Sequence, residues 1–457
     1  MPKSAHELPR VLTSAHATSI VVGIIIGSGI FLVPREMMAA VGKPGTVYAV
    51  WIVGGLLSLF GAMTYAEIAA MRPRYGGEYA FLKDAYGDLP AFLYMWTLLT
   101  IAKPASLATI AAGLIRVLGT FPRFGFLTQP AFAHLQWGQL IAIAGTWVIT
   151  ALNIRGTRES ANVQLSLTWL KGLLILVIAA FCFYGAGGNG SWHHFQTSFP
   201  AARAGFSGFM VALVAALWAY DGWSDVSQMA GEVEHPQRSL PIALIGGVAI
   251  VGALYMLTNA AIQYVLPAAA IADSERPAAD AMRLVAGKYG AMLVSLGMAV
   301  SIAATFVGSS LSGARIPFAA ARDGLFFKRL AHVHPRFRTP STALILQAVL
   351  TSILLLLIGK FQALFSLAIF SEWLAYGLTA STIFVFRHRD SAESRPFSIP
   401  GYPIVPVLFI VAATVLLVFS IKDQPMNSLA GLGVILCGIP AHFLFQRWHS
   451  ERHAPTH

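Results

Sequence analysis

Long apolar segments alternate with short polar ones along most of the chain. Four of them contain almost no ionisable side chains: Leu173 to Ala186, Ile242 to Val265, Ala343 to Ile358 and Val405 to Ile421. A helix of about 20 apolar residues crosses the hydrocarbon layer of a bilayer, whereas helices of a soluble protein carry polar outer faces that these segments lack. The pattern predicts an all-α polytopic membrane protein with twelve transmembrane helices, at about residues 15–42, 46–71, 90–118, 136–153, 162–186, 205–231, 240–266, 290–318, 340–358, 361–386, 403–421 and 427–447.

Composition and charge support this fold class. Of the 457 residues, 56% are hydrophobic and 11% are charged, whereas soluble domains carry roughly 25% charged residues. The net charge of +11 is spread over short segments between the apolar spans, so we expect no nucleic-acid partner. Both cysteines, Cys182 and Cys437, fall within predicted spans, and we expect no disulfide framework.

The basic residues predict the orientation of the chain. With both termini in the cytoplasm, more than half of the 31 lysines and arginines fall in cytoplasmic segments, as the positive-inside rule favours. Lys3 and Arg10 precede a first span that is longer than the apolar core of a cleavable signal, so we expect this span to be retained. No separate soluble domain is expected, and residues 1–453 are assigned to a single membrane domain.

Two predicted spans contain helix-breaking residues near their centres. Gly27-Ser28-Gly29 interrupts the first span and Asp221-Gly222 interrupts the sixth. Unpaired backbone groups are tolerated at membrane depth only where they line a polar cavity. Because the breaks are five spans apart, we expect two five-helix repeats of opposite orientation with a binding site between them. The expected boundaries are about 15–186 for repeat one, 205–386 for repeat two and 403–447 for two C-terminal accessory helices.

The two breaks offer complementary backbone groups. Beyond Gly27-Ser28-Gly29, free N–H groups and the positive end of a helix dipole suit a carboxylate. Free carbonyl groups suit an ammonium ion, and the expected ones lie at Ile25 and in the stretch Trp218, Ala219, Tyr220 and Asp221. An α-amino acid carries both charges and fits both sets. The alternative is that the glycines only allow close packing of helices.

Ionisable residues at membrane depth are functional candidates. Lys171 lies ~14 Å into the fifth span, where it needs carbonyl groups, a carboxylate or water, or must lose its proton. Lys103 precedes Pro104, and we expect it to fill the backbone gap that the proline creates or to reach the outer water. Arg315 is expected at the cytoplasmic boundary, as part of an inner gate or as an interfacial anchor.

Three carboxylates have simpler interpretations. Asp221 precedes a helix that restarts, and we favour a capping role for its side chain over direct chemistry. Glu67 lies near the inner end of the second span, and we include it with Arg315 among the gate candidates. Glu232 lies near the inner end of the sixth span, and we expect it in a solvated helix end.

Five segments together resemble the amino acid–polyamine–organocation (APC) transporter superfamily and, within it, the L-type amino-acid transporter family, in its bacterial form. The resemblance covers most of the chain. The segments are "GIIIGSGIF", "YAEIAAMRPRYGGEYAFLKDAYG" (Tyr65–Gly87), "LLTIAKPASLATIA" (Leu98–Ala111), "LWAYDGWSDVSQMAGEVEHPQRSLPIA" (Leu217–Ala243) and "ARDGLFFKRLAHVHPRFRTP" (Ala321–Pro340).

This resemblance implies a LeuT-like fold, with discontinuous helices 1 and 6, and a role for each residue of the breaks. Ser28 and Gly29 would bind the carboxylate of an amino acid, with Gly27 giving flexibility. The carbonyl groups of Ile25, Trp218 and Asp221 would bind its amino group, and the Trp218 side chain would form an outer gate.

The resemblance also implies that Lys171 occupies the place where sodium-coupled relatives hold Na⁺. Its partners would be the first break and Ser309 or Ser310, and it would act as a fixed cationic strut or as a proton carrier. Animal members of the family bond a partner through a cysteine in the loop that corresponds to residues 119–135. This loop contains no cysteine here, so we expect no disulfide-linked heavy-chain partner.

We therefore expect a secondary transporter of L-amino acids in the cell inner membrane, independent of sodium and working by exchange (as an antiporter) or with protons. The expected cavity wall, Ile26, Trp218, Tyr220, Val307 and small residues near Ala102, is apolar and favours small or aliphatic neutral substrates. A cationic amino-acid or polyamine carrier is the alternative, and an ion channel or a membrane-integral enzyme is a weaker one. We find no catalytic or metal-ligating constellation and expect no enzyme activity, metal or cofactor.

Overall fold

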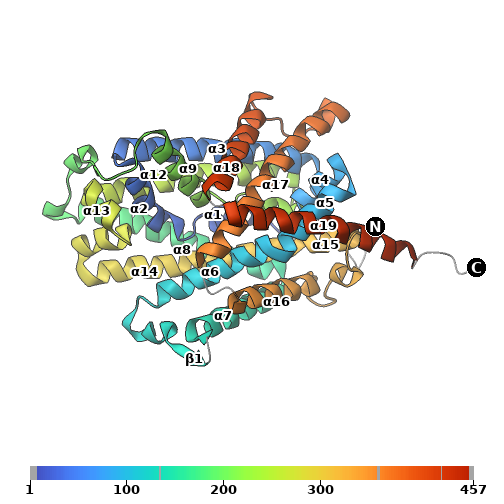
Figure 1. Ribbon diagram of the computed structural model, residues 1–457, viewed down its shortest axis with the longest axis horizontal. Helices are drawn as coiled ribbons and strands as arrows, with labels where there is room; N and C mark the ends of the chain where they lie inside the picture. The colour runs from blue at the N-terminus through green and yellow to red at the C-terminus, as the bar shows by residue number, and fades with distance from the viewer. Residues whose placement is uncertain (1–7, 133–134, 358–360, 424, 452–457) are drawn as a thin grey trace, which may run out of the picture.

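A computed structural model describes residues 8–132, 135–357, 361–423 and 425–451. The ends of the expected domain 1–453 and the expected positions of the two termini lie outside these residues. The chain forms a bundle of long helices, most of which follow the long axis of the molecule (Figure 1). In the order of the chain, the α-helices are α1 Ser14–Ile25, α2 Gly29–Val41, α3 Pro44–Met71, α4 Glu78–Tyr86, α5 Asp88–Thr97, α6 Lys103–Leu118, α7 Trp137–Arg155, α8 Thr157–Tyr184, α9 Gly205–Ala219, α10 Asp225–Gln228, α11 Pro236–Pro241, α12 Gly247–Val265, α13 Ala268–Asp273, α14 Pro277–Gly313, α15 Arg315–Arg322, α16 Ser341–Leu357, α17 Phe361–Arg389, α18 Ile404–Asp423 and α19 Pro425–Glu451.

Each predicted span coincides with one helix or with an interrupted series of helices. Within the described residues, eight helical stretches are long and apolar enough to cross a membrane, and the bent pair α1–α2 makes a ninth. The apolar helices α9 and α16 are shorter, and α17 covers the tenth predicted span. The prediction of a nearly all-helical polytopic fold is confirmed.

Short segments of other geometry interrupt or connect the long helices. Two are π-helical: Leu98–Ala102 ends two residues before Pro104, and Ile242–Gly246 begins directly after Pro241. Pro104 lacks the N–H that an α-helix would pair with Thr100, and its ring crowds that carbonyl, so the preceding turn widens. The strands β1 (Pro130–Phe132) and β2 (Leu135–Gln136) form a small antiparallel hairpin. The 3-10 turns are Pro122–Thr128, Gly187–Asn189, Trp192–Gln196, Ala230–Glu232, Lys328–Ala331 and Ala392–Ser394.

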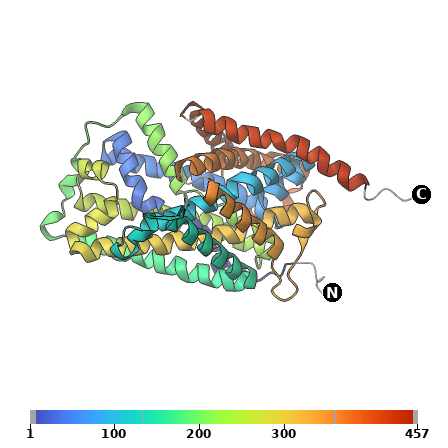
Figure 2. The same ribbon diagram turned by 60° about the horizontal axis from the view of Figure 1, so that its bottom comes forward.

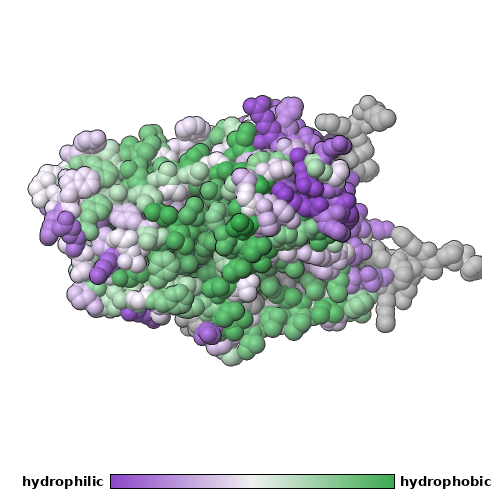
Figure 3. All heavy atoms as spheres, turned by 90° about the horizontal axis from the view of Figure 1, so that it is seen from above, coloured by the Kyte–Doolittle hydropathy of each residue, from purple (hydrophilic) through white to green (hydrophobic). Residues whose placement is uncertain are grey.

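Polar residues gather at the two ends of the molecule. Hydrophobic residues cover the middle of the face in Figure 3, and hydrophilic residues are densest at the right end of this view. That end carries α4, α15 and the first described residues, since Leu8 packs in one cluster with Tyr79 and Phe318. Because its loops also hold many arginines and lysines, we call it the basic end. The opposite end, at the left of Figure 1, carries α13.

The helices around the centre of the bundle form a continuous scaffold. The helix α14 contacts α8 and α6, and α1 contacts α8, α14 and α12. The second C-terminal helix, α19, runs along the outside of the bundle, where it contacts α5 and α17 (Figures 1 and 2). The two broken helices therefore lie inside a frame built from both halves of the chain.

Candidate binding site

The two predicted helix breaks are present. The helix α1 ends at Ile25 and α2 begins at Gly29, with a bend of 42° between them. The helix α9 ends at Ala219 and α10 begins only at Asp225. Between them Gly222 has φ +101°, a backbone conformation that side chains with a Cβ rarely adopt. The sequence therefore located both interruptions.

The breaks also face each other. A Cβ added at Gly222 would lie 2.5 Å from Cγ2 of Ile24, and one added at Gly29 would lie 3.3 Å from Cβ of Ala219. The hydroxyl group of Tyr255, on α12, donates to the carbonyl oxygen of Ile25 at 3.1 Å and to that of Ala219 at 2.7 Å. Tyr255 thus connects the two breaks, a role that the sequence analysis missed.

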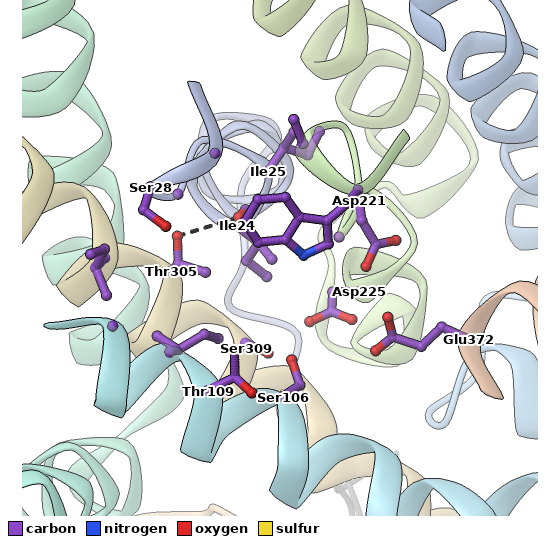
Figure 4. A pocket seen from close by; sticks show the side chains of 18 of the residues that line it. Ile24, Ile25, Ser28, Ser106, Thr109, Asp221, Asp225, Thr305, Ser309 and Glu372 are labelled. Atoms are coloured by element: carbon purple, nitrogen blue, oxygen red, sulfur yellow. Dashed lines mark hydrogen bonds between the residues drawn. The ribbon is translucent and has the colours of Figure 1, made fainter. Parts of the chain in front are cut away.

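A cavity opens between the breaks, with α6, α14 and α17 completing its wall. The break residues that line it are Ile24, Ile25, Gly27, Ser28, Gly29, Trp218, Ala219, Asp221 and Gly222. Figure 4 shows Ser28 and Thr305 on one side of this cavity and the carboxyl groups of Asp221, Asp225 and Glu372 on the other.

The first break supplies hydrogen-bond donors to the cavity. Ser28 and Gly29 stand at the N-terminus of α2, where backbone N–H groups have no partner within the helix. In the described part of the chain, the N–H groups of Ser28 and Gly29 make no hydrogen bond, whereas that of Gly27 donates to the carbonyl of Ile25 at 2.8 Å. The arrangement provides two free donors and the positive end of a helix dipole for an anionic group.

The carbonyl groups expected to bind an ammonium ion are partly occupied. The carbonyl of Ile25 accepts from both Gly27 and Tyr255, and that of Ala219 accepts from Tyr255. The carbonyl of Trp218 accepts from the N–H of Asp221 at 3.1 Å. A carbonyl oxygen can accept two hydrogen bonds, so the carbonyl of Ala219, held in place by Tyr255, keeps room for a further donor.

The expected apolar wall is only partly correct. Ile26, Tyr220 and Val307 are buried but do not line the cavity within the described residues. The Tyr220 hydroxyl instead donates to the carbonyl of Trp51 at 3.3 Å. The reason is geometric, because the turn after Ala219 rotates Tyr220 toward α3 and α12, where its ring contacts Trp51 and Tyr255.

Lys171 lies against the first break, as expected. Its Nζ donates to the carbonyl of Gly23 at 2.5 Å and to that of Ile26 at 2.7 Å, and its side chain is fully buried. The hydroxyl groups that share these carbonyls belong to Ser301 and Thr305. The sequence analysis named Ser309 and Ser310 for this place, one to two turns too far along α14.

The position of Ser309 and Ser310 explains this correction. Ser309 lines the cavity, and the carbonyl of Ser310 accepts from Gln347 at 3.1 Å. The axial position of α14 relative to α1 decides which turn reaches the carbonyls. That position depends on packing and not on the spacing of serines in the sequence.

Lys103 forms a buried ion pair at the cavity wall. Its Nζ lies 2.6 Å from Oδ2 of Asp225, which also accepts from the Ser312 hydroxyl at 2.7 Å. Lys103 is 5% exposed. The expectation that it fills a backbone gap or extends to the outer water is therefore wrong, because a carboxylate is available to neutralise it inside the bundle.

Asp221 does not cap the restarted helix. The residue before α10 is Ser224, and the side chain of Asp221 instead accepts from the Tyr376 hydroxyl at 2.8 Å. Glu372, on α17, lines the same cavity. Glu372 and Asp225 were not among the candidate residues, although both lie in predicted spans, where a search for carboxylates would have found them.

Arg315 forms a buried ion pair at the basic end. Its Nε lies 2.7 Å from Oε1 of Glu232, and its Nη2 donates to the Thr157 hydroxyl at 2.8 Å. Arg315 and Glu232 are both fully buried. The expected solvated position of Glu232 is therefore wrong, and the anchor interpretation of Arg315 is replaced by an ion pair that joins three helical segments.

Glu67 belongs to a different contact. Its Oε1 and Oε2 accept from Nε and Nη2 of Arg387 at 2.7 and 2.6 Å, and Oε2 also accepts from the N–H of Ile399. This pair ties α3 to α17 at the basic end. It lies outside the cavity lining within the described residues.

Comparison with known proteins identifies relatives along almost the whole chain. Residues 12–438 match the family described as amino acid permease. The serine/threonine exchanger SteT of Bacillus subtilis (strain 168) is 33% identical over 436 residues, covering 93% of this chain and 94% of that protein. The human cystine/glutamate transporter is 29% identical over 449 residues, covering 97% and 87%. The mouse b(0,+)-type amino acid transporter 1 is 30% identical over 431 residues, covering 93% and 86%.

Proposed function

Because this chain belongs to the amino acid permease family and is a secondary transporter of amino acids, we propose that it carries small or aliphatic neutral L-amino acids by alternating access, without sodium. The substrate carboxylate binds the N–H groups of Ser28 and Gly29, and its amino group binds carbonyl groups near Ala219. The related serine/threonine exchanger makes serine and threonine the first substrates to test.

One observation carries this proposal. Free N–H donors at the start of α2 and partly occupied carbonyl acceptors at the end of α9 face the same cavity. A zwitterion with both charged groups attached to one carbon atom matches such a pair of helix ends, whereas a simple cation or anion would use only one of them.

Sodium independence follows from the place of Lys171. Its ammonium group lies on two carbonyl oxygens and beside the hydroxyl groups of Ser301 and Thr305. A sodium ion needs a shell of carbonyl and hydroxyl oxygen atoms such as these, and the ammonium group of Lys171 already occupies this shell. Lys171 then acts as a strut between α8 and the first break.

Alternating access requires a closed side and an open side. We propose that the chain lies in the cell inner membrane with both termini inside, and the excess of lysine and arginine at the basic end supports its assignment to the cytoplasm. The Arg315–Glu232 pair closes the cytoplasmic side, and Trp218 serves as the outer gate. The matching breaks in α1–α2 and α9–α10 support two inverted repeats at about residues 15–186 and 205–386.

A cationic substrate is the second candidate. Three carboxyl groups, those of Asp221, Asp225 and Glu372, line the cavity, and Lys103 neutralises one of them. The basic side chain of a cationic substrate would supply a positive charge for the carboxyl groups that Lys103 does not neutralise. L-Lysine in the substrate panel separates this candidate from the first.

Counterflow in liposomes tests the function. Purified protein is reconstituted into vesicles loaded with one unlabelled L-amino acid, and entry of the labelled amino acid is measured for each of a panel, with Na⁺ or with choline outside. We expect counterflow of small neutral amino acids that is equal in both salts. Methyl esters and N-acetyl derivatives should fail to compete, because each lacks one charge of the zwitterion. An ion current without counterflow would contradict the proposal, and competition by the blocked derivatives would contradict the assigned site.

A further inference from the structure

A cavity separate from the central one lies at the basic end. It has a volume of about 480 Å³ and is bordered by the residues before α1, the loop between α3 and α4, the helix α4, the turn Ala230–Glu232 and the helix α15. It shares no lining residue with the cavity between the helix breaks. Hydrophilic residues are densest at this end of the molecule (Figure 3). The charged residues of its lining are Arg10, Arg74, Lys83, Asp84, Arg322 and Asp323.

Both carboxylates of this lining already have cationic partners. Oδ1 of Asp84 lies 3.1 Å from Nη1 of Arg74, and Oδ2 of Asp323 lies 2.7 Å from Nζ of Lys83. The Tyr79 hydroxyl also donates to Oδ2 of Asp323 at 3.1 Å. The two carboxylates are therefore neutralised within the wall of the cavity, and the remaining charge of the lining is positive.

Arg10 and Arg322 supply this remaining charge. Both side chains are exposed, and among the described residues neither guanidinium group lies within 4.0 Å of a carboxylate oxygen. The Arg322 guanidinium lies over the ring of Phe318, 5.8 Å from its centroid, and this contact leaves the N–H groups at its edge for another partner. Two arginines from distant segments thus line one cavity without an anionic partner.

The chemistry of this lining suits a phosphate group. The planar fork of an arginine donates to two oxygens of one phosphate, and the several oxygens of a phosphate accept from two arginines on different sides. A chloride ion offers a single atom and would leave most of a cavity of about 480 Å³ unfilled. A zwitterionic amino acid would bring an ammonium group to Asp84 and Asp323, which already have cationic partners.

The two arginines belong to segments that meet at the Arg315–Glu232 pair. Arg10 stands two residues before Leu12, whose N–H donates to the carbonyl oxygen of Glu232 at 3.0 Å. Arg322 ends α15, the helix that begins with Arg315. A group bound to both Arg10 and Arg322 would therefore add a further link between the segments that the Arg315–Glu232 ion pair joins.

We propose that the cavity at the basic end binds a phosphate group between Arg10 and Arg322 and that the bound group holds these segments together. In the proposed function this end opens toward the cytoplasm, so the bound phosphate slows transport. That effect rests on the proposed function, whereas binding itself does not. Soluble inorganic phosphate and the headgroup of an anionic phospholipid at the membrane surface offer the same oxygens, and the experiment separates these two sources.

Hydrogen exchange at residues 8–12 and 230–233 tests the binding. The purified protein in detergent is compared in inorganic phosphate and in potassium chloride of equal ionic strength. Exchange in these segments should be about threefold slower at a phosphate concentration of about twice its Kd. For the lipid source, the protein is reconstituted without free phosphate in phosphatidylcholine alone or in phosphatidylcholine with phosphatidylglycerol. The second composition should slow exchange in the same segments if the headgroup is the source.

Substitution of the arginines tests the site. Arg10→Gln and Arg322→Gln should each lose the protection, and both positions are exposed, so neither change disturbs the core. Arg322→Lys keeps the charge but not the fork and should lose part of it. Arg123→Gln is the matched control, because Arg123 is an exposed arginine in the turn Pro122–Thr128, outside this cavity lining. It should keep the full protection.

Counterflow with phosphate on both sides of the vesicle membrane tests the effect on transport. The rate should fall in the unmodified protein and in Arg123→Gln, and it should not respond to phosphate in Arg10→Gln or Arg322→Gln. Absence of counterflow in every condition would contradict the proposed function, and the exchange data would still decide the binding. Protection without any slowing of counterflow would contradict the effect on transport.

The exchange experiment also separates the other occupants. Protection by inorganic phosphate or by phosphatidylglycerol supports the site and identifies the source of the phosphate group. Equal protection in chloride overturns the proposal, as does full protection by phosphate in both Arg10→Gln and Arg322→Gln. Protection by L-serine that requires the same arginines overturns it in favour of a second amino-acid site.

Discussion

Lys171 fixes the unwound part of the first helix from the side of α8. Its ammonium group binds two carbonyl oxygens that no longer pair within α1, and hydroxyl groups of α14 bind the same oxygens. A cation at membrane depth is tolerated only with such partners. At the scale of single residues, a buried charge with hydrogen-bond partners therefore stabilises the shape of the break. Glu78 is the opposite case, because it is a buried carboxyl group whose Oε2 has no hydrogen-bond partner among the described residues.

Lys171→Ala should destabilise the break and slow transport. The substitution removes two hydrogen bonds from a charged donor, each worth about 1.5–3 kcal/mol, while Ser301 and Thr305 still donate to the same two carbonyl groups. We expect a lower Tm in detergent and a counterflow rate reduced about tenfold or more, since ~1.4 kcal/mol corresponds to a tenfold change. The exposed Lys288→Ala is the control. Normal counterflow in Lys171→Ala would show that the strut is dispensable.

Glu78→Gln should stabilise the protein in a way that depends on pH. The folded pKa of about 7 exceeds the unfolded value of about 4.3, so burial of this group costs nothing well below pH 4. The free-energy cost of burying Glu78 rises as the pH increases from the unfolded pKa to the folded pKa. Above about pH 7 this cost is constant, on the order of 3 kcal/mol. The Tm difference between Glu78→Gln and the unmodified protein should grow from pH 5 to pH 7 and then level off. A difference that is independent of pH would show that Glu78 is not poised in this way.

At the scale of elements, two broken helices share one contact. Gly222 allows the chain to turn sharply after α9, and the absence of a Cβ allows Ile24 to approach its backbone. Tyr255 holds the carbonyl groups of both breaks with one hydroxyl. We therefore expect a change at either break to alter the other.

Gly222→Ala should disturb both breaks. The new Cβ would lie 2.5 Å from Cγ2 of Ile24, at a φ of +101° that is strained for alanine. We expect a loss of about 2 kcal/mol or more in stability and a strong loss of counterflow. Gly145→Ala is the matched control, since Gly145 lies inside α7 with nothing within 4 Å of its added Cβ, and it should be neutral or slightly stabilising. Equal Tm values for the two variants would contradict the tight contact.

At the scale of the whole molecule, buried polar contacts join three segments at the basic end. Arg315 on α15 pairs with Glu232 from the sixth span and with Thr157 on α8. Leu12 and Val233 form a backbone bridge next to Glu232, so the residues before α1 are tied to the same segment. In the proposed orientation, these contacts join segments that separate when the transporter opens toward the cytoplasm.

Glu232→Gln should shift the protein toward that open state. Removal of one partner leaves Arg315 as an unpaired buried charge, which costs about 3–5 kcal/mol in the closed state. Hydrogen exchange should become faster at residues 8–12 and 230–233. Asp280→Asn, which alters an exposed ion pair near the opposite end, should leave these segments unchanged. Equal protection from hydrogen exchange in both variants would show that the Arg315–Glu232 pair does not keep the gate closed.

The sequence by itself determined the spans, the positions of both breaks and the family. Apolar length and the backbone preferences of glycine are local properties, so "IIIGSGIF" and "WAYDGW" contain the signals for their own interruption. Lys171 was located at membrane depth in the same way, and its contact with the first break agrees with the structure. The inverted repeats remain a prediction, because matching breaks alone support them.

Only the tertiary structure decided which buried charges meet. Lys103 and Asp225 are 122 positions apart, and Arg315 and Glu232 are 83 apart. The sequence shows that each buried charge needs a partner, but several partners satisfy that need equally well. The choice depends on the rotation and axial position of packed helices, which also placed Ser301 and Thr305, and not Ser309 and Ser310, beside Lys171. Pairing of this kind is a property of contacts between distant segments, so no local pattern contains it.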